Sequence, residues 1–255
     1  MNIISIINNK GGVGKTTITQ NIGVCMAKNG YKTALIDFDA QANLSYCIKH
    51  TPKKDLGTLL INKAPITIDD FSTTTYENLY LLPNNKDINS TLFGRMIPTD
   101  QLFLLKNILK GLNTFDFIFI DTAPNLDTPT FNAMIVSNHI LIPVEFDIFS
   151  AIGLAVLYEN INSAKQVNPN INVLGVITSQ VYEGRKINKD MKEPLIKHFG
   201  DIVFKSTIRT NEKFKRAQAE QTDIFNYESS ATEKRGSEDI EKLTKELLKK
   251  LKKLN

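Results

Sequence analysis

The chain has 255 residues, of which 42% are hydrophobic and 23% charged, a composition typical of a globular protein with a sizeable core. No apolar run approaches the ~20 residues of a transmembrane helix, which excludes a membrane-spanning protein but not a peripheral one. The two cysteines, Cys25 and Cys47, fit no metal or redox spacing, and no apolar leader precedes the first predicted strand. We therefore expect a cytoplasmic protein in a reducing environment.

The formal net charge of +4 is unevenly distributed along the chain. Residues 185–255 contain 18 Lys and Arg against 12 Asp and Glu, whereas residues 1–184 contain 13 against 15. A basic C-terminal third favours a surface that meets a polyanion. The alternative is a set of lysine-rich helices that are simply solvated.

Short apolar runs rich in β-branched residues alternate along the chain with amphipathic stretches of helical period. The apolar runs predict strands at residues 3–7, 32–38, 78–83, 115–121, 139–144 and 171–178, with a weaker one at 201–208. The periodic stretches predict helices at residues 15–29, 53–62, 99–112, 127–137, 149–167, 187–199 and 237–253. Polar residues between Pro83 and Pro98 predict a loop at residues 84–98.

Several of the predicted strands are apolar on both faces, which is typical of parallel strands covered by helices on each side. The alternation of strands and helices implies right-handed crossovers. We therefore predict an α/β fold, with a doubly wound, mostly parallel sheet and helices on both of its faces. No linker or repeat interrupts the pattern, so we expect a single domain spanning residues 1–255.

The stretch NNKGGVGKTT, residues 8–17, lies between the first predicted strand and the first predicted helix. Gly14, Lys15 and Thr16 complete the end of the phosphate-loop pattern G-x-x-x-x-G-K-[ST], although Asn9 stands where its first glycine is expected. The glycines allow backbone N–H groups to converge on phosphate oxygens, and the helix that follows adds the positive end of its dipole. We expect Lys15 to reach the β- and γ-phosphates of a nucleotide and Thr16 to bind Mg²⁺.

Carboxylates follow two further strands at their carboxyl ends, where α/β sheets bind ligands. The run FIFIDTAP ends its apolar part at Asp121, and ALIDFDAQAN ends its own with Asp37 and Asp39 on one face. Buried carboxylates need partners, and Mg²⁺ with its waters would supply one. The alternative for Asp37 or Asp39 is a residue that caps a loop.

Together these motifs resemble the ParA/MinD family of deviant Walker ATPases, and in particular its ParA (Soj-like) partition branch. This resemblance implies a P-loop NTPase of the deviant Walker A type. It extends through nearly the whole chain. The segments that carry it are KGGVGKTT (10–17), DFDAQANLS (37–45), YENLYLLPNN (76–85), FIFIDTAPNL (117–126), ILIPVEFDIFSAIGL (140–154) and, more loosely, 178–185 and 205–217.

The resemblance implies a role for each residue of the predicted ATP site. Lys10 is similar to the signature lysine that contacts the nucleotide of the partner subunit in a dimer formed around ATP. Asp39 matches the carboxylate that orients the attacking water, and with Lys10 and Lys15 it forms the catalytic set. Asp37 and Asp121 match residues that organise Mg²⁺, with Thr16 as a direct ligand. The residues expected to bind the nucleotide are Lys10, Gly11, Gly12, Val13, Gly14, Lys15, Thr16 and Thr17.

The resemblance also implies that the ATP-bound dimer binds DNA without sequence preference, and that a ParB-type adaptor stimulates ATP hydrolysis and releases the DNA. Contacts from Lys and Arg to phosphates give such sequence-blind affinity. The protein would then be associated with the nucleoid. Arg209-Thr210 stand where the family has Pro-Arg, and Lys213 replaces an arginine. The expected DNA contacts are Arg185, Lys186, Arg209, Lys213, Lys215 and Arg216.

Only Met1 and Asn2 precede the first predicted strand, so we expect no N-terminal helix-turn-helix domain. Two related functions stay open: a MinD-like ATPase that cycles on a membrane, and a ParA-like ATPase that positions a cargo other than DNA. A reductase like the nitrogenase iron protein is excluded, because no cysteine follows Cys47 to hold an iron–sulfur cluster.

Membrane cycling would require the C-terminal helix to bind lipid. Its apolar stripe with flanking lysines has the pattern of an interfacial helix, but the same pattern is the usual one for a helix packed on a sheet, which we favour. The stripe consists of Ile240, Leu243, Leu247, Leu251 and Leu254.

Overall fold

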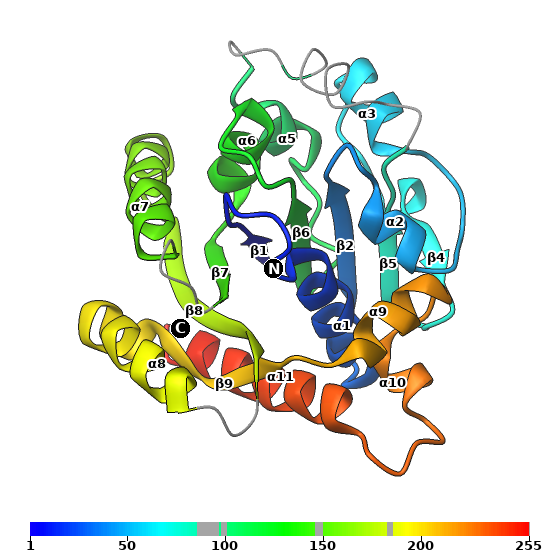
Figure 1. Ribbon diagram of the computed structural model, residues 1–255. Helices are drawn as coiled ribbons and strands as arrows, with labels where there is room; N and C mark the ends of the chain where they lie inside the picture. Colours follow the sequence, from blue (N-terminus) through cyan, green and yellow to red (C-terminus); the bar gives the residue numbers. More distant parts are fainter. Residues whose placement is uncertain (86–96, 98–100, 146–149, 183–185, 255) are drawn as a thin grey trace.

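The computed structural model describes residues 1–85, 97, 101–145, 150–182 and 186–254 (Figure 1). Its strands form one sheet in the order β3-β4-β5-β2-β6-β1-β7-β8-β9. Strand β4 runs antiparallel to both of its neighbours, and the other pairings are parallel. The strands are β1 (Asn2–Ile6), β2 (Thr33–Phe38), β3 (His50–Thr51), β4 (Ser72–Thr74), β5 (Leu79–Leu82), β6 (Phe117–Thr122), β7 (His139–Glu145), β8 (Asn172–Val181) and β9 (Val203–Arg209).

Helices cover both faces of this sheet, which confirms the predicted fold class (Figure 1). They are α1 (Lys15–Lys28), α2 (Asn43–Cys47), α3 (Leu56–Asn62), α5 (Leu104–Ile108), α6 (Thr128–Val136), α7 (Ser150–Val167), α8 (Lys186–Phe199), α9 (Glu212–Ala219), α10 (Ile224–Tyr227) and α11 (Arg235–Lys252). The described residues also contain two 3₁₀ turns, at Ile68–Asp70 and Gly200–Ile202.

The side chains of strand β1 show which helices cover each face of the sheet. Ile4 and Ile6 pack with residues of α1 and α11 on one face, whereas Ile3 packs with residues of α3 and α5 on the other. On that second face, α6 and α7 pack over β7 and β8. Successive strand residues point to opposite faces, so a strand covered on both sides must be apolar at nearly every position.

Helix α11 packs against α1 and the edge strand β9. Ile240, Leu243 and Leu247 are fully buried, while Leu254, beyond the helix, is 54% exposed. The predicted packing of this apolar stripe on the sheet is therefore confirmed for the helix itself. One carboxylate of α11 also satisfies part of the open edge of β9: Glu246 accepts from the backbone N–H of Lys205 and Ser206 at 2.8 Å each. Among the described residues, no helix is both long and apolar enough to cross a bilayer.

The predicted strands all occur, with ends shifted by at most three residues, but several short elements were missed. The predicted helix 53–62 begins later, at Leu56, because Asp55 caps it by accepting from the Thr58 N–H at 3.0 Å. Most of the predicted loop 84–98 lies outside the described residues. The unpredicted elements are β3, β4, α2, α9 and α10, each of eight residues or fewer.

Candidate active site

Three predicted site segments meet at the carboxyl ends of adjacent strands. In the sheet register, Asp121 of β6 lies opposite Ile6 of β1 on one side and opposite Asp37 of β2 on the other. The phosphate loop, residues 8–17, follows β1 directly, and β1 lies between β6 and β7. Crevices at such strand ends are where open α/β sheets bind ligands.

The phosphate loop is folded around the side chain of Lys15. The Lys15 ammonium donates to the carbonyl oxygens of Asn8 and Lys10, at 3.1 Å each. Gly12 and Gly14 have φ values of 78° and 87°, in the left-handed region that favours glycine. Burial lowers the pKa of Lys15, and the charges of Asp121 and Asp39 partly oppose that effect. Lys15 is thus a desolvated cation at the centre of the loop.

Asp121 and Asp37 are buried carboxylates beside the first turn of α1. The Thr16 hydroxyl donates to Asp121 Oδ2 at 2.7 Å. Burial, together with the charge of Asp37, raises the pKa of Asp121 to about 8. Burial also raises the pKa of Asp37 to about 6, although the backbone N–H and hydroxyl of Ser45 donate to it at 2.8 and 2.6 Å. A cation bound between two such close carboxylates would stabilise their charged forms.

Asp39 lies on the wall of the same site. Its side chain accepts from the Gln41 N–H at 2.9 Å, and its backbone carbonyl accepts from the Asn84 amide at 3.0 Å. Burial raises the pKa of Asp39, while the charge of Lys15 lowers it. Asp39 is therefore fixed by its neighbours at the pocket that Lys15 and Thr16 also line.

Lys10 is directed toward β7 of its own chain. Its ammonium lies 3.0 Å from Glu145 Oε2, and both side chains are about one-third exposed, at 39% and 33%. The backbone N–H of Lys10 donates to Asn8 Oδ1 at 2.9 Å, and the Asn8 amide donates to the Pro143 carbonyl at 2.6 Å. The front of the phosphate loop is thereby tied to β7.

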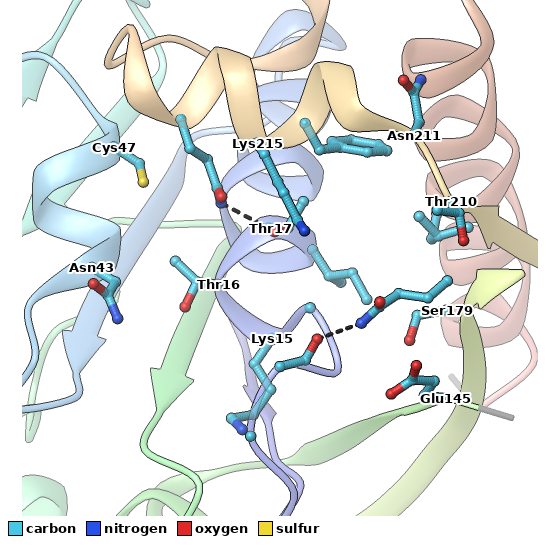
Figure 2. A pocket seen from close by; sticks show the side chains of 18 of the residues that line it. Lys15, Thr16, Thr17, Asn43, Cys47, Glu145, Ser179, Thr210, Asn211 and Lys215 are labelled. Carbon is cyan, nitrogen blue, oxygen red and sulfur yellow. Dashed lines mark hydrogen bonds between the residues drawn. The ribbon is translucent and has the colours of Figure 1, made fainter. Parts of the chain in front are cut away.

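A pocket of about 850 Å³ extends from the phosphate loop to α9 (Figure 2). This volume lies within the range of sites for small molecules and cofactors. Two glutamines join the C-terminal third to the loop: Gln180 donates to the Gly12 carbonyl, and Gln218 donates to the Thr17 hydroxyl at 3.0 Å. Neither was predicted, because their partners are 168 and 201 residues away in sequence. No local pattern signals such contacts.

Comparison with known proteins shows the family to which the chain belongs. A family model described as an AAA domain matches residues 1–173. The chain is 32% identical over 247 residues to the chromosome-partitioning ATPase Soj of Treponema pallidum, with 95% of each protein covered. It is 30% identical over 251 residues to the sporulation initiation inhibitor protein Soj of Bacillus subtilis, covering 96% of this chain and 97% of that protein. The chain belongs to the ParA/MinD family of ATPases.

A solved structure is similar to this chain over nearly its whole length. The putative plasmid partition protein of Borrelia burgdorferi, bound to AMPPNP, is 27% identical and has a TM-score of 0.77. The match covers 99% of both chains. The family resemblance predicted from the motifs is thus confirmed, and the fold is shared through α9 and α11 as well as the phosphate loop.

The six predicted DNA contacts of this ParA/MinD-type chain lie in different surroundings. Arg209 forms a bidentate pair with Asp239, with its nitrogens 2.8–3.1 Å from the two carboxylate oxygens. Lys213 lies 3.5 Å from Glu228, which is fully buried. Arg216 pairs with the exposed Glu212 at 3.2 Å. Lys215 lines the pocket. Arg185 lies outside the described residues, and Lys186 is the first residue of α8.

Proposed function

We propose that this protein is a Mg²⁺-dependent ATPase that dimerises around two ATP molecules, binds DNA non-specifically in that state and thereby partitions DNA. The observation that carries this proposal is the meeting of the phosphate loop with Asp37, Asp39 and Asp121 at one pocket. The partition roles that the names of the Treponema pallidum Soj protein and the Borrelia protein indicate support the choice of DNA as cargo. We take the whole of 1–255 as a single ATPase domain.

The phosphate loop supplies the affinity for ATP. Its backbone N–H groups and the N-terminus of α1 face one pocket, where they would bind the phosphates. Among the described residues, the Lys15 ammonium donates to two carbonyl oxygens, and burial desolvates it. Phosphate oxygens would bind it more strongly than those carbonyls do. Phosphate charge would also restore the pKa that burial lowers.

The residues around Thr16 fit Mg²⁺ rather than a metal held by protein alone. A hydroxyl and two buried carboxylates lie together there, and Mg²⁺ characteristically keeps several waters and phosphate oxygens in its shell. Within the described ranges, no group of three or more His, Cys, Asp or Glu side chains is arranged to hold a metal. Mg²⁺, when bound, would offset the charge of the phosphates.

Hydrolysis would then depend on Asp39 and on a second subunit. Asp39 lines the pocket and would orient a water toward the terminal phosphate. Phosphoryl transfer requires mainly such positioning and charge stabilisation. Lys10 would leave Glu145 to contact the nucleotide of the partner subunit. A ParB-type adaptor would complete the site, so the ATPase acting alone would be slow.

The DNA-binding surface that we propose contains fewer residues than the sequence predicted. Arg209 and Lys213 are engaged by Asp239 and Glu228, which suits a structural role. Arg216 has only an exposed ion pair, which is weak and easily exchanged for a phosphate. We therefore propose that Arg216 contacts DNA together with Arg185 and Lys186. Arg209 and Lys213 would instead stabilise the fold.

The proposal is tested by measuring retention of the purified protein on plasmid DNA with ATP, with ADP and without nucleotide. Retention only with ATP, lost in Lys10→Ala, is the expected result. Binding to anionic vesicles is measured in parallel, because a MinD-like function would give ATP-dependent binding to lipid and none to DNA. The burial of the α11 stripe disfavours that second outcome.

A further inference from the structure

Helix α9 presents one face to the nucleotide pocket and another to solvent. The residues of α9 and its N-cap that line the pocket are Asn211, Glu212, Phe214, Lys215 and Gln218, and all but Glu212 follow the i, i+3, i+4, i+7 spacing of one helical face. Lys213 and Arg216 lie outside the pocket lining. The cations of this helix therefore divide into two sets, and Lys215 is the one directed at the pocket (Figure 2).

The position of α9 over the pocket is fixed by contacts at both ends of its pocket face. At the C-terminal end, the Gln218 amide donates to the Thr17 hydroxyl at 3.0 Å. Phe214 is buried, with 7% of its surface exposed, and packs in the core beside α1 and α11. At the N-terminal end, Asn211 caps the helix by accepting from the Lys213 N–H at 2.9 Å. Lys215 thus extends toward the phosphate loop from an anchored helix.

Lys215 differs from the other described cations around the pocket and on α9 in having no partner. The Lys15 ammonium is bound by two loop carbonyls, and Arg209 is bound by Asp239. On α9 itself, Lys213 pairs with Glu228 and Arg216 with Glu212. In the part of the chain that the structure describes, the Lys215 ammonium makes no hydrogen bond or ion pair. A cation that faces an anion-binding pocket without a carboxylate of its own is suited to an anionic ligand.

We propose that Lys215 binds the nucleoside-proximal phosphate of the bound nucleotide, from the side of the pocket opposite Lys15. This rests on the proposed nucleotide binding. Thr17 follows the residues assigned to the outer phosphates and Mg²⁺, and Lys215 is on the same helix face as Gln218, which contacts Thr17. Lys215 is then a nucleotide ligand and not a DNA contact. Through it, α9 would sense whether a nucleotide is present.

The test measures ADP affinity by isothermal titration calorimetry, which needs no hydrolysis, dimer or DNA. We expect Lys215→Gln to bind ADP about tenfold more weakly, as loss of one charged phosphate contact requires. Lys215→Arg keeps the charge and should stay within about threefold of the wild type. The matched control is Lys245→Gln, which removes one exposed positive charge on α11, 80% exposed, and should change affinity by less than about twofold.

The outcomes separate this inference from the function on which it rests. Wild-type ADP affinity in Lys215→Gln, with the same thermal melting curve, would overturn the assignment. If that variant also lost retention on DNA, Lys215 would belong to the DNA surface instead. A wild-type protein with no affinity for ADP would refute the nucleotide site itself. Weaker ADP binding in Lys215→Gln, with adenosine bound as before and an unchanged melting curve, would establish the phosphate contact.

Discussion

The ammonium of Lys10 lies 3.0 Å from a carboxylate oxygen of Glu145 in the same chain. In the proposed function, Lys10 contacts the nucleotide of a partner subunit. We expect contact with that nucleotide to draw the Lys10 ammonium away from Glu145, so that dimerisation breaks the internal pair. With both side chains about one-third exposed, the pair contributes only about 0.2–1 kcal/mol. The internal pair is thus a weak restraint on the monomer, which a contact with phosphate can replace.

Glu145→Gln is expected to dimerise more readily than the wild type. Replacing the carboxylate removes one partner of Lys10 and should lower the ATP concentration for half-maximal dimerisation by about two- to fivefold. Analytical ultracentrifugation across an ATP series measures this shift, with Lys10→Ala as the variant that stays monomeric. A variant that needs more ATP than the wild type would instead place Glu145 among the contacts that hold the dimer together.

Asp39→Ala is expected to separate ATP binding from ATP hydrolysis. The phosphate loop and Asp121 remain intact, so the variant should still dimerise with ATP, while hydrolysis falls by about 10²-fold or more without the water-orienting carboxylate. Size-exclusion chromatography in ATP and a phosphate-release assay give the two readouts. A variant that elutes as a monomer, or that hydrolyses ATP at the wild-type rate, contradicts the role assigned to Asp39.

Asp121→Asn is expected to change how stability depends on pH. Because the pKa of Asp121 is raised from an ordinary 3.8 to about 8, the folded chain holds a proton that the unfolded chain releases between those values. The wild type therefore loses stability as pH rises through that window, and the amide does not. Without Mg²⁺ or nucleotide, the melting temperature of the variant minus that of the wild type should be larger at pH 9 than at pH 6. The same difference at pH 6 and at pH 9 would contradict a protonated Asp121.

Lys213→Gln tests whether Lys213 supports the fold. It pairs with Glu228, whose fully buried carboxylate also accepts from the Ser237 N–H and hydroxyl at 2.9 Å each. Removing the cation leaves that buried charge short of a partner, so the free energy of unfolding should fall by about 1–3 kcal/mol. Arg216→Gln, at an exposed pair, should cost less than about 0.5 kcal/mol. Urea denaturation measures the free energy of unfolding of both variants. Equal losses would contradict the assignment of Lys213 to fold stabilisation and of Arg216 to the DNA-binding surface.

The phosphate loop and its carboxylates could be predicted because their signals are local. A glycine-rich turn directly follows an apolar strand, and Asp37 and Asp121 directly follow apolar runs. Parallel strands then bring those ends together without further information from the sequence. The same reasoning predicted the order of the main elements and the mostly parallel sheet.

What could not be predicted is how distant segments meet. Glu145 and Lys10 are 135 residues apart, and Gln218 and Thr17 are 201 residues apart. Helix α9 has too few residues and too many charges for a clear hydrophobic period. Without the pairing of Lys213 with Glu228 and the placement of Lys215 in the pocket, every lysine of α9 looked equally suited to DNA.

The central claim is that ATP converts this chain into a dimer that holds DNA, with Lys10 acting between the subunits. Its most direct test is the fluorescence anisotropy of a labelled duplex of random sequence, titrated with wild-type protein and with Lys10→Ala. We expect tight binding by the wild type with ATP, little with ADP, and little by Lys10→Ala with either nucleotide. Equal binding by the two proteins in ATP, or equal binding of the wild type in ATP and ADP, would contradict it.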